Sequence, residues 1–398
     1  MASPIKTLKA RKFLPMLGDR QARFAAGKNA VPDAPDTARA IAKALHPIRQ
    51  YLTVKEIIER APDCRSYILA PDESRGTKAL APFGAGKYLS VFETVNGMPV
   101  SRAYSISSAP ADALNGFYEL TVRRVEDGLV SRHIHDTWAV GSKVEASAPA
   151  GNFEYQPLRD APTVIGLAGG SGITPFLSMA KAIRDGDEDF RLTLLYGSKT
   201  ADGILFREEL DAIAAATDKV KVVHVLSDEE AEGMRHGFLT ADLIREFAPK
   251  GAPYSVFLCG SQQMYAFVDQ EVEKLGLAKK YVRHELFGEF HNPASLPEYP
   301  KNVPATVNIT VTVQDKTVTV SGSTQDSVMQ ILEKNGVAVP ARCRSGECGF
   351  CHTHMLSGEV FVPKHLEYRR MADAQFGCIH PCCSFPLTDL VLNVPAAK

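Results

Sequence analysis

Between residues 51 and 157, hydrophobic and polar positions alternate in short runs separated by turn-forming residues. Clear runs cover residues 65–69, 87–92 and 118–125. Alternation with a period of two is typical of a strand with one buried face, and closely spaced short strands are typical of small barrels. The pattern therefore predicts an antiparallel β-barrel over residues 51–157.

From residue 158 onward, strand and helix patterns alternate. Helical patterns begin near Pro175 and Phe206. The apolar runs between them cover residues 163–168, 191–196, 220–226 and 254–259. This rhythm predicts an α/β doubly wound parallel sheet over residues 158–290.

Four prolines then interrupt residues 291–304, a density that neither a helix nor a central strand tolerates. We predict a linker here. Beyond it, the pattern predicts a hairpin over residues 306–320, a helix over residues 326–335 and a last strand over residues 387–394. The pattern predicts a third, α+β domain over residues 305–398.

The first 50 residues differ from the rest because they contain ten Lys or Arg against three Asp. We predict a basic, partly helical extension. It could dock onto an acidic partner or a membrane surface. Since charge runs usually face water, we favour a solvated helix packed against the first domain.

The composition of the 398 residues, with 45% hydrophobic and 23% charged residues and a formal net charge of −1, is that of a globular protein. It gives no reason to expect a nucleic-acid partner. Neither a secretory signal nor a run of eighteen apolar residues is visible. We therefore predict a cytoplasmic protein without membrane association.

Six of the eight cysteines fall in the last sixty residues. Such bunching favours a metal site in a reducing compartment over a disulfide scaffold. Cys343, Cys348 and Cys351 have the C-x4-C-x2-C spacing of plant-type [2Fe–2S] sites. Gly346 and Gly349 supply the permissive backbone that a tight cluster loop needs.

Two other kinds of metal site are alternatives to a [2Fe–2S] cluster at these cysteines. A structural zinc site normally comes as two paired cysteine knuckles. A Rieske centre would need His354 and His380 as ligands, but their order relative to Cys351 and Cys378 is reversed and Cys343 would have no role. The spacing therefore favours the [2Fe–2S] cluster.

Residues 305–398 resemble the plant-type ferredoxin domain, including the Met-Leu-Ser-Gly-Glu run at 355–359. The resemblance implies a β-grasp fold. In that family the fourth ligand lies four residues before a Pro-x-x-Asp strand start, here residues 386–389, although Cys378 and Cys383 remain alternatives. The implied ligands are Cys343, Cys348, Cys351 and Cys382.

A flavin signature lies in the barrel region. Arg102 and Tyr104 share one face of a predicted strand, which offers a cation for a phosphate beside an aromatic plate for a ring. Residues 128–131 precede a candidate helix at 133–136, whose free N–H groups could bind a pyrophosphate. Alone, each motif is weak.

A glycine-rich turn at residues 169–175 lies between a predicted strand and a helix with Pro175 at its start. Such a turn brings backbone N–H groups close to a pyrophosphate. Lys199 could bind the 2′-phosphate of NADPH. An acidic residue at that strand end would favour NADH, and the sequence has none there. The choice of nicotinamide remains open.

These motifs make residues 51–290 resemble the ferredoxin–NADP reductase superfamily. Further segments that match the superfamily are residues 121–124, 149–153, 196–198, 259–264 and 285–288. The resemblance implies that Arg102 binds the flavin phosphate, Tyr104 stacks on the flavin ring, and Ser105 and Cys259 act at the flavin and the nicotinamide. FAD is favoured over FMN because the pyrophosphate turn is intact. The implied cofactor-binding residues are Arg102, Tyr104, Ser105, Val122, Gly128, Val130, Ser131, Gly169, Gly170, Ser171, Gly172, Thr174, Ser198, Cys259, Gly260 and Phe287.

A nicotinamide gives up two electrons as hydride, a [2Fe–2S] cluster accepts one at a time, and a flavin can do both. The domain order resembles the reductase components of multicomponent oxygenases. We therefore predict an NAD(P)H-dependent reductase that passes single electrons to a separate acceptor protein. The alternatives are a ferredoxin– or flavodoxin–NAD(P) reductase running in reverse and a redox sensor without turnover.

Overall fold

The computed structural model describes residues 18, 20–23, 25, 37–126, 128–286 and 288–394. They belong to two units, Met1–Leu45 and His46–Lys398. In the first unit, helix α2 (Thr37–Leu45) has no buried residue. Among the described helices, none is long and apolar enough to cross a membrane.

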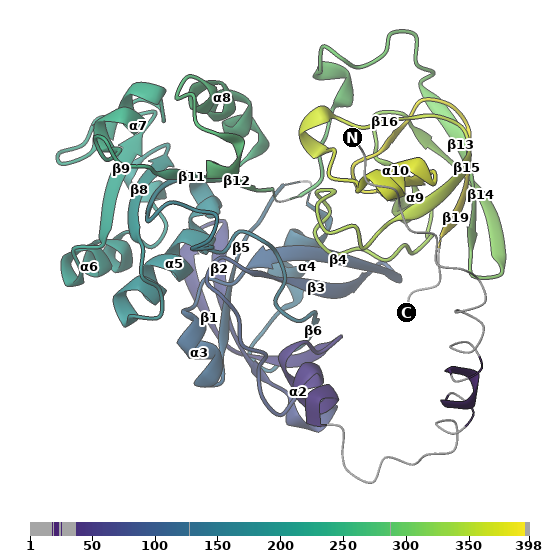
Figure 1. Cartoon of the computed structure of the whole chain (residues 1–398), viewed down its shortest axis with the longest axis horizontal. Helices are drawn as coiled ribbons and strands as arrows, with labels where there is room; N and C mark the ends of the chain where they lie inside the picture. Colours follow the sequence, from purple (N-terminus) through teal and green to yellow (C-terminus); the bar gives the residue numbers. More distant parts are fainter. Residues whose placement is uncertain are drawn as a thin grey trace. The chain divides into compact units, whose positions relative to one another are not determined.

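Sheet A, at the start of the second unit, is antiparallel with the order β4-β3-β6-β1-β2-β5 (Figure 1). A bridge between Ile106 and Leu120 joins the ends of its two edge strands and closes the sheet into a barrel. Alternate side chains such as Leu52 and Val54 fill the interior. The elements are β1 (Gln50–Ala61), β2 (Cys64–Pro71), β3 (Tyr88–Val95), β4 (Met98–Ser105), α3 (Pro110–Leu114), β5 (Tyr118–Arg123), α4 (Leu129–Thr137) and β6 (Lys143–Ala146).

Sheet B is parallel, with the order β10-β9-β8-β7-β11-β12. The order reverses between β7 and β11, and ligands of doubly wound sheets bind at the carboxyl ends of strands that flank such a point. Its strands are β7 (Thr163–Gly169), β8 (Arg191–Ser198), β9 (Val220–Leu226), β10 (Arg235–His236), β11 (Ser255–Cys259) and β12 (Val282–Glu285). Its helices are α5 (Thr174–Asp185), α6 (Arg207–Ala216), α7 (Ala241–Phe247) and α8 (Gln262–Glu273).

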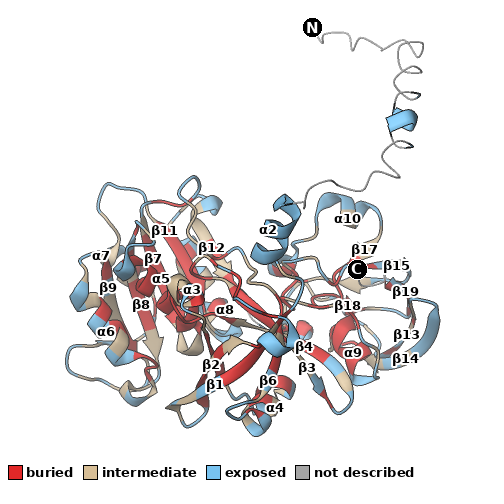
Figure 2. Ribbon diagram, turned by 90° about the horizontal axis from the view of Figure 1, so that it is seen from below, coloured by how far each residue is buried: buried red, intermediate tan, exposed pale blue. Residues whose placement is uncertain are grey.

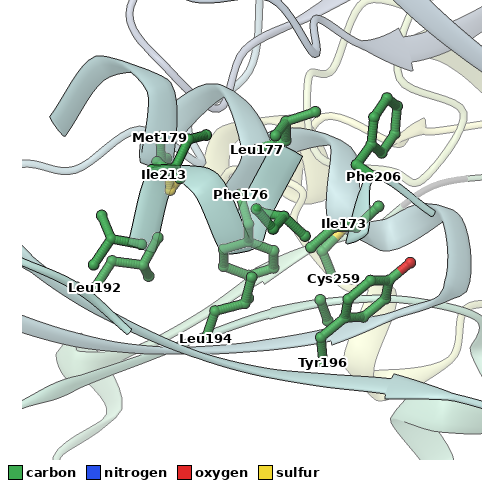
Figure 3. Close-up of a cluster of buried hydrophobic side chains, with 14 of the residues drawn as sticks. Ile173, Phe176, Leu177, Met179, Leu192, Leu194, Tyr196, Phe206, Ile213 and Cys259 are labelled. Atoms are coloured by element: carbon green, nitrogen blue, oxygen red, sulfur yellow. The ribbon is translucent and has the colours of Figure 1, made fainter. Parts of the chain in front are cut away.

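Both faces of sheet B are covered, so its central strands β7 and β11 are almost entirely buried (Figure 2). The edge strand β10 is exposed. On one face, Leu192 and Leu194 pack against Phe176 of α5 and Ile213 of α6 (Figure 3). On the other face, residues of β7 and β11 pack against α7 and α8. The doubly wound arrangement predicted from the alternating strand and helix patterns is therefore confirmed.

Sheet C is mixed, with the order β14-β13-β19-β15-β17, and β16 pairs with β18 separately. Helix α9 packs on it through Ile331 and Leu332, as expected for a β-grasp domain. The elements are β13 (Thr306–Val313), β14 (Lys316–Ser323), α9 (Val328–Lys334), β15 (Thr353–Ser357), β16 (Val360–Phe361), α10 (Met371–Gln375), β17 (Cys378–Ile379), β18 (Phe385–Pro386) and β19 (Leu390–Val394).

Element ends differ from the sequence prediction by a few residues. Helix α6 begins after Phe206, because Phe206 has a left-handed backbone with φ of 56°. Helix α9 begins after Ser327, whose hydroxyl accepts the N–H of Gln330 in a capping box. Strand β19 begins at Leu390, and residues 291–304 hold only a short 3-10 turn at Pro293–Ser295.

Candidate functional site

One cavity of about 1580 Å³ is lined by residues that follow or belong to all three sheets. The carboxyl ends of β7, β8 and β11 contribute, together with strand β4 and the start of α4. The predicted site residues that line it are Arg102, Tyr104, Ser105, Gly128, Val130, Ser131, Gly169, Gly170, Ser171, Gly172, Thr174, Ser198, Gly260 and Cys343. The structure thus brings together motifs that lie up to 241 positions apart, from Arg102 to Cys343.

Strand β4 presents Arg102, Tyr104 and Ser105 to the cavity. The Arg102 side chain is 22% exposed, and burial together with the nearby cation of Arg344 lowers the pKa of its guanidinium. The Ser105 hydroxyl is buried and has no hydrogen-bond partner among the described residues. Because an orphaned buried hydroxyl is costly, this oxygen fits a hydrogen bond to a bound molecule, as expected next to a flavin ring.

The first turn of α4 opens toward the cavity with Gly128 as its N-cap and no side-chain cap. A Cβ on Gly128 would lie 2.3 Å from Ser131 Oγ and 2.9 Å from Val125 Cβ, so only glycine fits this turn. The first N–H groups of a helix carry partial positive charge. This turn therefore fits a pyrophosphate group.

The glycine-rich turn between β7 and α5 passes directly over the end of β11. A Cβ on Gly172 would lie 2.1 Å from the carbonyl oxygen of Cys259, and Gly170 has a φ of 53°. Arg123 Nη1 lies 3.1 Å from the position of a Cβ on Gly170. The turn thus combines close backbone approach, a helix start and a cation, which suits a second phosphate group.

Two of the described residues that were predicted to bind cofactors, Cys259 and Val122, do not line the cavity. The Cys259 side chain is fully buried in the hydrophobic cluster drawn in Figure 3, and the lining of the cavity starts at Gly260. Val122 is fully buried in the barrel, and its carbonyl accepts a hydrogen bond from His135. Phe287 lies outside the described residues. The roles assigned to these residues stay predictions.

Ser198, at the end of β8, lines the cavity, and its buried hydroxyl has no hydrogen-bond partner within the part of the chain that the structure describes. Beside it, the backbone carbonyl oxygen of Lys199 accepts a hydrogen bond from the backbone N–H of Asp228 at 3.0 Å. Asp228 also lines the cavity and follows the neighbouring strand β9. The sequence prediction missed Asp228, because only the pairing of β8 with β9 brings it to Lys199.

The cysteine loop gathers four thiols. The backbone N–H of Cys348 donates to Cys343 Sγ at 3.3 Å, and Cys351 Sγ lies 3.5 Å from Cys382 Sγ. Hydrogen bonds from Cys348 and Cys382 hold the pKa of the Cys343 thiol well below its usual value. The Cys383 thiol instead contacts a backbone carbonyl of the same segment, that of His380, at 3.5 Å. This geometry supports Cys382 as the fourth ligand.

In the described ranges, no three His, Cys, Asp or Glu side chains are arranged to hold a single metal ion. A [2Fe–2S] cluster instead takes four cysteines, two on each iron. Gly346 fits such a loop, because a Cβ there would lie 2.7 Å from Cys383 Sγ and its φ is 84°. The thiols and the glycines of this loop therefore suit a two-iron cluster.

Comparison with known proteins agrees with this geometry. Residues 52–155 match an oxidoreductase FAD-binding domain, residues 167–270 an oxidoreductase NAD-binding domain and residues 311–387 a 2Fe-2S iron-sulfur cluster binding domain. NADH-cytochrome b5 reductase 1 of Candida glabrata is 33% identical over 49% of this chain and 69% of its own length. The chain belongs to the ferredoxin–NADP reductase superfamily. The reductase also carries a C-terminal plant-type [2Fe–2S] domain.

Longer relatives match the reductase over all three regions. The ferredoxin reductase component of 3-ketosteroid-9-alpha-monooxygenase from Rhodococcus rhodochrous is 28% identical over 85% of this chain and 94% of its own length. The glycine betaine monooxygenase reductase subunit of Pseudomonas aeruginosa is 26% identical over 90% and 98%. The structure of phthalate dioxygenase reductase is 25% identical, with a TM-score of 0.62 over 87% of this chain and 98% of its own.

These findings confirm several sequence predictions. The reductase is an oxidoreductase and an electron-transport flavoprotein that takes electrons from NAD(P)H and carries FAD and a [2Fe–2S] cluster. Its fold class, an antiparallel barrel followed by a doubly wound sheet and a β-grasp domain, is also confirmed. The orphaned hydroxyls, the glycine turns and the four thiols all fit these groups.

Sequence reasoning also missed a charged group in the lining of the cavity. Glu289, Glu333 and Arg344 line it together with Arg102. Charged residues in loops and on helices usually face water, so nothing in their spacing marks them as buried. These three charged residues become buried only because the cysteine loop packs against the barrel.

Proposed function

We propose that this protein is the reductase component of an oxygenase system and passes single electrons to a separate oxygenase protein. The full-length relatives support this assignment, because they are named as reductase components or subunits of monooxygenases. Other redox metalloenzymes remain the competing class of acceptor. A location in the cytoplasm is part of the same proposal.

The observation that carries the proposal is the shared cavity. Arg102 and Ser105, the Gly169–Thr174 turn and Cys343 all contribute to its lining. FAD held there would supply the chemistry that links the two-electron donor NAD(P)H to the one-electron cluster. The chain supplies positions: Arg102 and the first turn of α4 for the FAD phosphates, and the Gly169–Thr174 turn for the nicotinamide nucleotide.

The cavity offers no side chain that must act as a general acid or base for this reaction. Ser105 orients the flavin through its free hydroxyl. Burial raises the pKa of the Cys259 thiol well above its usual value, so this residue stays a neutral packing group beneath the nicotinamide end of the cavity. The proposed ligands Cys343, Cys348, Cys351 and Cys382 hold the cluster.

An anaerobic titration of the purified protein with NADH and with NADPH tests the proposal. We expect loss of the flavin absorbance and a rhombic EPR signal of a reduced plant-type cluster. Transfer to cytochrome c should then follow in the presence of excess nicotinamide. A yellow protein that bleaches without an EPR signal would contradict the one-electron route, and a protein that NAD(P)H does not bleach would point to the redox-sensor alternative.

A further inference from the structure

Two arginines and two glutamates meet where the cysteine loop contacts the barrel. Arg102 comes from β4, Glu289 follows β12, Glu333 lies on α9, and Arg344 lies between Cys343 and Ser345. The Arg344 side chain is 1% exposed, and the glutamate side chains are 6% and 7% exposed. Buried charges of this kind persist only when they are paired.

Arg344 forms hydrogen-bonded ion pairs with both glutamates. Its Nη1 donates to Glu333 Oε1 at 2.7 Å and its Nη2 to Glu333 Oε2 at 2.5 Å, while its Nε donates to Glu289 Oε1 at 2.5 Å. Arg102 lies farther away, at 4.0 Å from one oxygen of each glutamate. The forked contact with the glutamates is therefore made by Arg344, whereas Arg102 donates its hydrogen bond to the carbonyl oxygen of Ser101 at 2.8 Å.

The charges bear directly on phosphate binding at Arg102. Burial alone would raise the pKa of Glu289, but the cations of Arg344 and Arg102 lower it, so this carboxylate stays ionised. A phosphate at Arg102 would therefore approach two buried carboxylates. Like charges repel strongly in such surroundings unless a cation compensates them. Arg344 is that cation.

The backbone of the loop depends on the same contacts. Arg344 has a φ of 60°, a left-handed conformation that residues with a Cβ rarely adopt. Such a conformation persists where the surroundings hold it. The two glutamates anchor the Arg344 side chain, and the adjacent Cys343 is a proposed cluster ligand. Glu289 is itself fixed, because its carbonyl accepts from Gln262 of α8 at 2.6 Å.

We propose that Glu289 and Arg344 form an interdomain ion pair that couples FAD binding at Arg102 to the docking of the cluster loop. The inference rests on the proposed role of Arg102 at the flavin phosphate. With the loop docked, Arg344 neutralises the glutamates and leaves Arg102 to the phosphate. With the loop displaced, Glu289 and Glu333 compete for Arg102. Glu289 and Arg344 are thus positioning residues for both cofactors.

Two variants of the full-length protein test this with opposite expected signs. Arg344→Met leaves the carboxylates uncompensated and should raise the dissociation constant of FAD about 5-fold or more, the lower end of typical couplings between sites. Glu289→Gln removes one competing charge and should leave FAD binding equal or tighter. Both should slow reduction of the cluster about 5-fold or more in stopped-flow experiments on protein saturated with FAD.

Cluster content, measured by EPR after dithionite reduction, shows whether the loop still assembles. If Arg344→Met lacks the cluster, Glu289→Gln alone tests the coupling between FAD binding and cluster reduction, because Glu289 lies outside the cysteine loop. Arg283→Met is the matched control: it breaks another buried ion pair, with Asp160 at 2.8 Å, and should lower stability without changing FAD affinity or cluster reduction.

An unchanged rate of cluster reduction in Glu289→Gln would overturn the inference, as would weaker FAD binding in that variant. A wild-type protein that binds no FAD would instead refute the proposed roles in the cavity. The two failures are therefore distinguishable.

Discussion

At the scale of single residues, Cys348 differs from the other proposed cluster ligands because it is an exposed residue, whereas Cys343, Cys351 and Cys382 are buried. We expect electrons to leave the protein on this side. Cys348→Ser should retain bleaching of the flavin by the nicotinamide but lose reduction of cytochrome c. Cys378→Ser is the control, since this thiol lies on β17 away from the four-sulfur group, and it should keep both activities. Unchanged cytochrome c reduction in Cys348→Ser would refute the route.

Asp228 gives a second prediction at this scale. It lies beside Lys199 at the end of the cavity where β8 and β9 end, and acidic residues at such positions hydrogen-bond the ribose 2′-hydroxyl of NADH. Asp228→Asn removes a negative charge that opposes the 2′-phosphate. We expect kcat/KM for NADPH relative to NADH to rise up to about 5-fold, because an exposed charge interaction contributes about 1 kcal/mol.

Lys199→Met is the matched variant and should shift the same ratio toward NADH. Steady-state kinetics with both nucleotides measure the effect. If the ratio of kcat/KM for NADPH to kcat/KM for NADH is the same in both variants and in the wild type, neither residue contacts the 2′ position of the nucleotide.

Motif spacing predicted the residues that act through local geometry. Arg102 and Tyr104 follow strand alternation, and Gly128 and Gly172 mark turns. The first three of the proposed cluster ligands lie within nine positions, so each of these motifs can be found in a short stretch of sequence. Asp228 and the Arg344 group cannot, because their partners come from other strands and domains. Proximity of that kind is set by packing rather than by period.

At the scale of elements, Glu119 of β5 joins the barrel to helix α5 of sheet B. Lys181 Nζ lies 3.5 Å and Arg60 Nη2 2.8 Å from its carboxylate, and the Glu119 side chain is 5% exposed. Burial alone would raise the pKa of Glu119, but Lys181, Ser66 and Arg60 lower it. The folded state therefore favours the charged carboxylate.

Glu119→Gln should lower the free energy of unfolding by about 2 kcal/mol at pH 7, because Arg60 loses its carboxylate partner and Lys181 keeps only Glu209, at 2.9 Å. Since the folded pKa is lowered, this contribution is present above the unfolded value near 4.3 and is lost as pH falls through the folded pKa. Urea denaturation at pH 7 and below pH 4 measures it, and the difference between variant and wild type should shrink in acid. Glu246→Gln, an exposed glutamate, should change stability by less than about 0.5 kcal/mol.

Periodicity predicted the principal strands and helices, since apolar runs and helical patterns carry that information locally. It did not predict the short pair β16 and β18 or the exposed five-residue helix α10. Two-residue strands have no period to detect. The order of strands in sheet B, which creates the switch point between β7 and β11, also depends on which runs pair in three dimensions.

At the scale of the whole molecule, the shared cavity implies a serial order of electron transfer. The Gly169–Thr174 turn, the flavin residues of β4 and Cys343 line one space, so electrons from the nicotinamide should reach the cluster only when FAD is present. Protein stripped of FAD should keep its cluster, because the proposed ligands lie in a separate β-grasp domain. NADH should then give no cluster EPR signal, and added FAD should restore it. Dithionite is the control, since it should reduce the cluster with or without FAD. An NADH-dependent EPR signal from the stripped protein would contradict this order, because electrons would then reach the cluster by a route that bypasses the flavin.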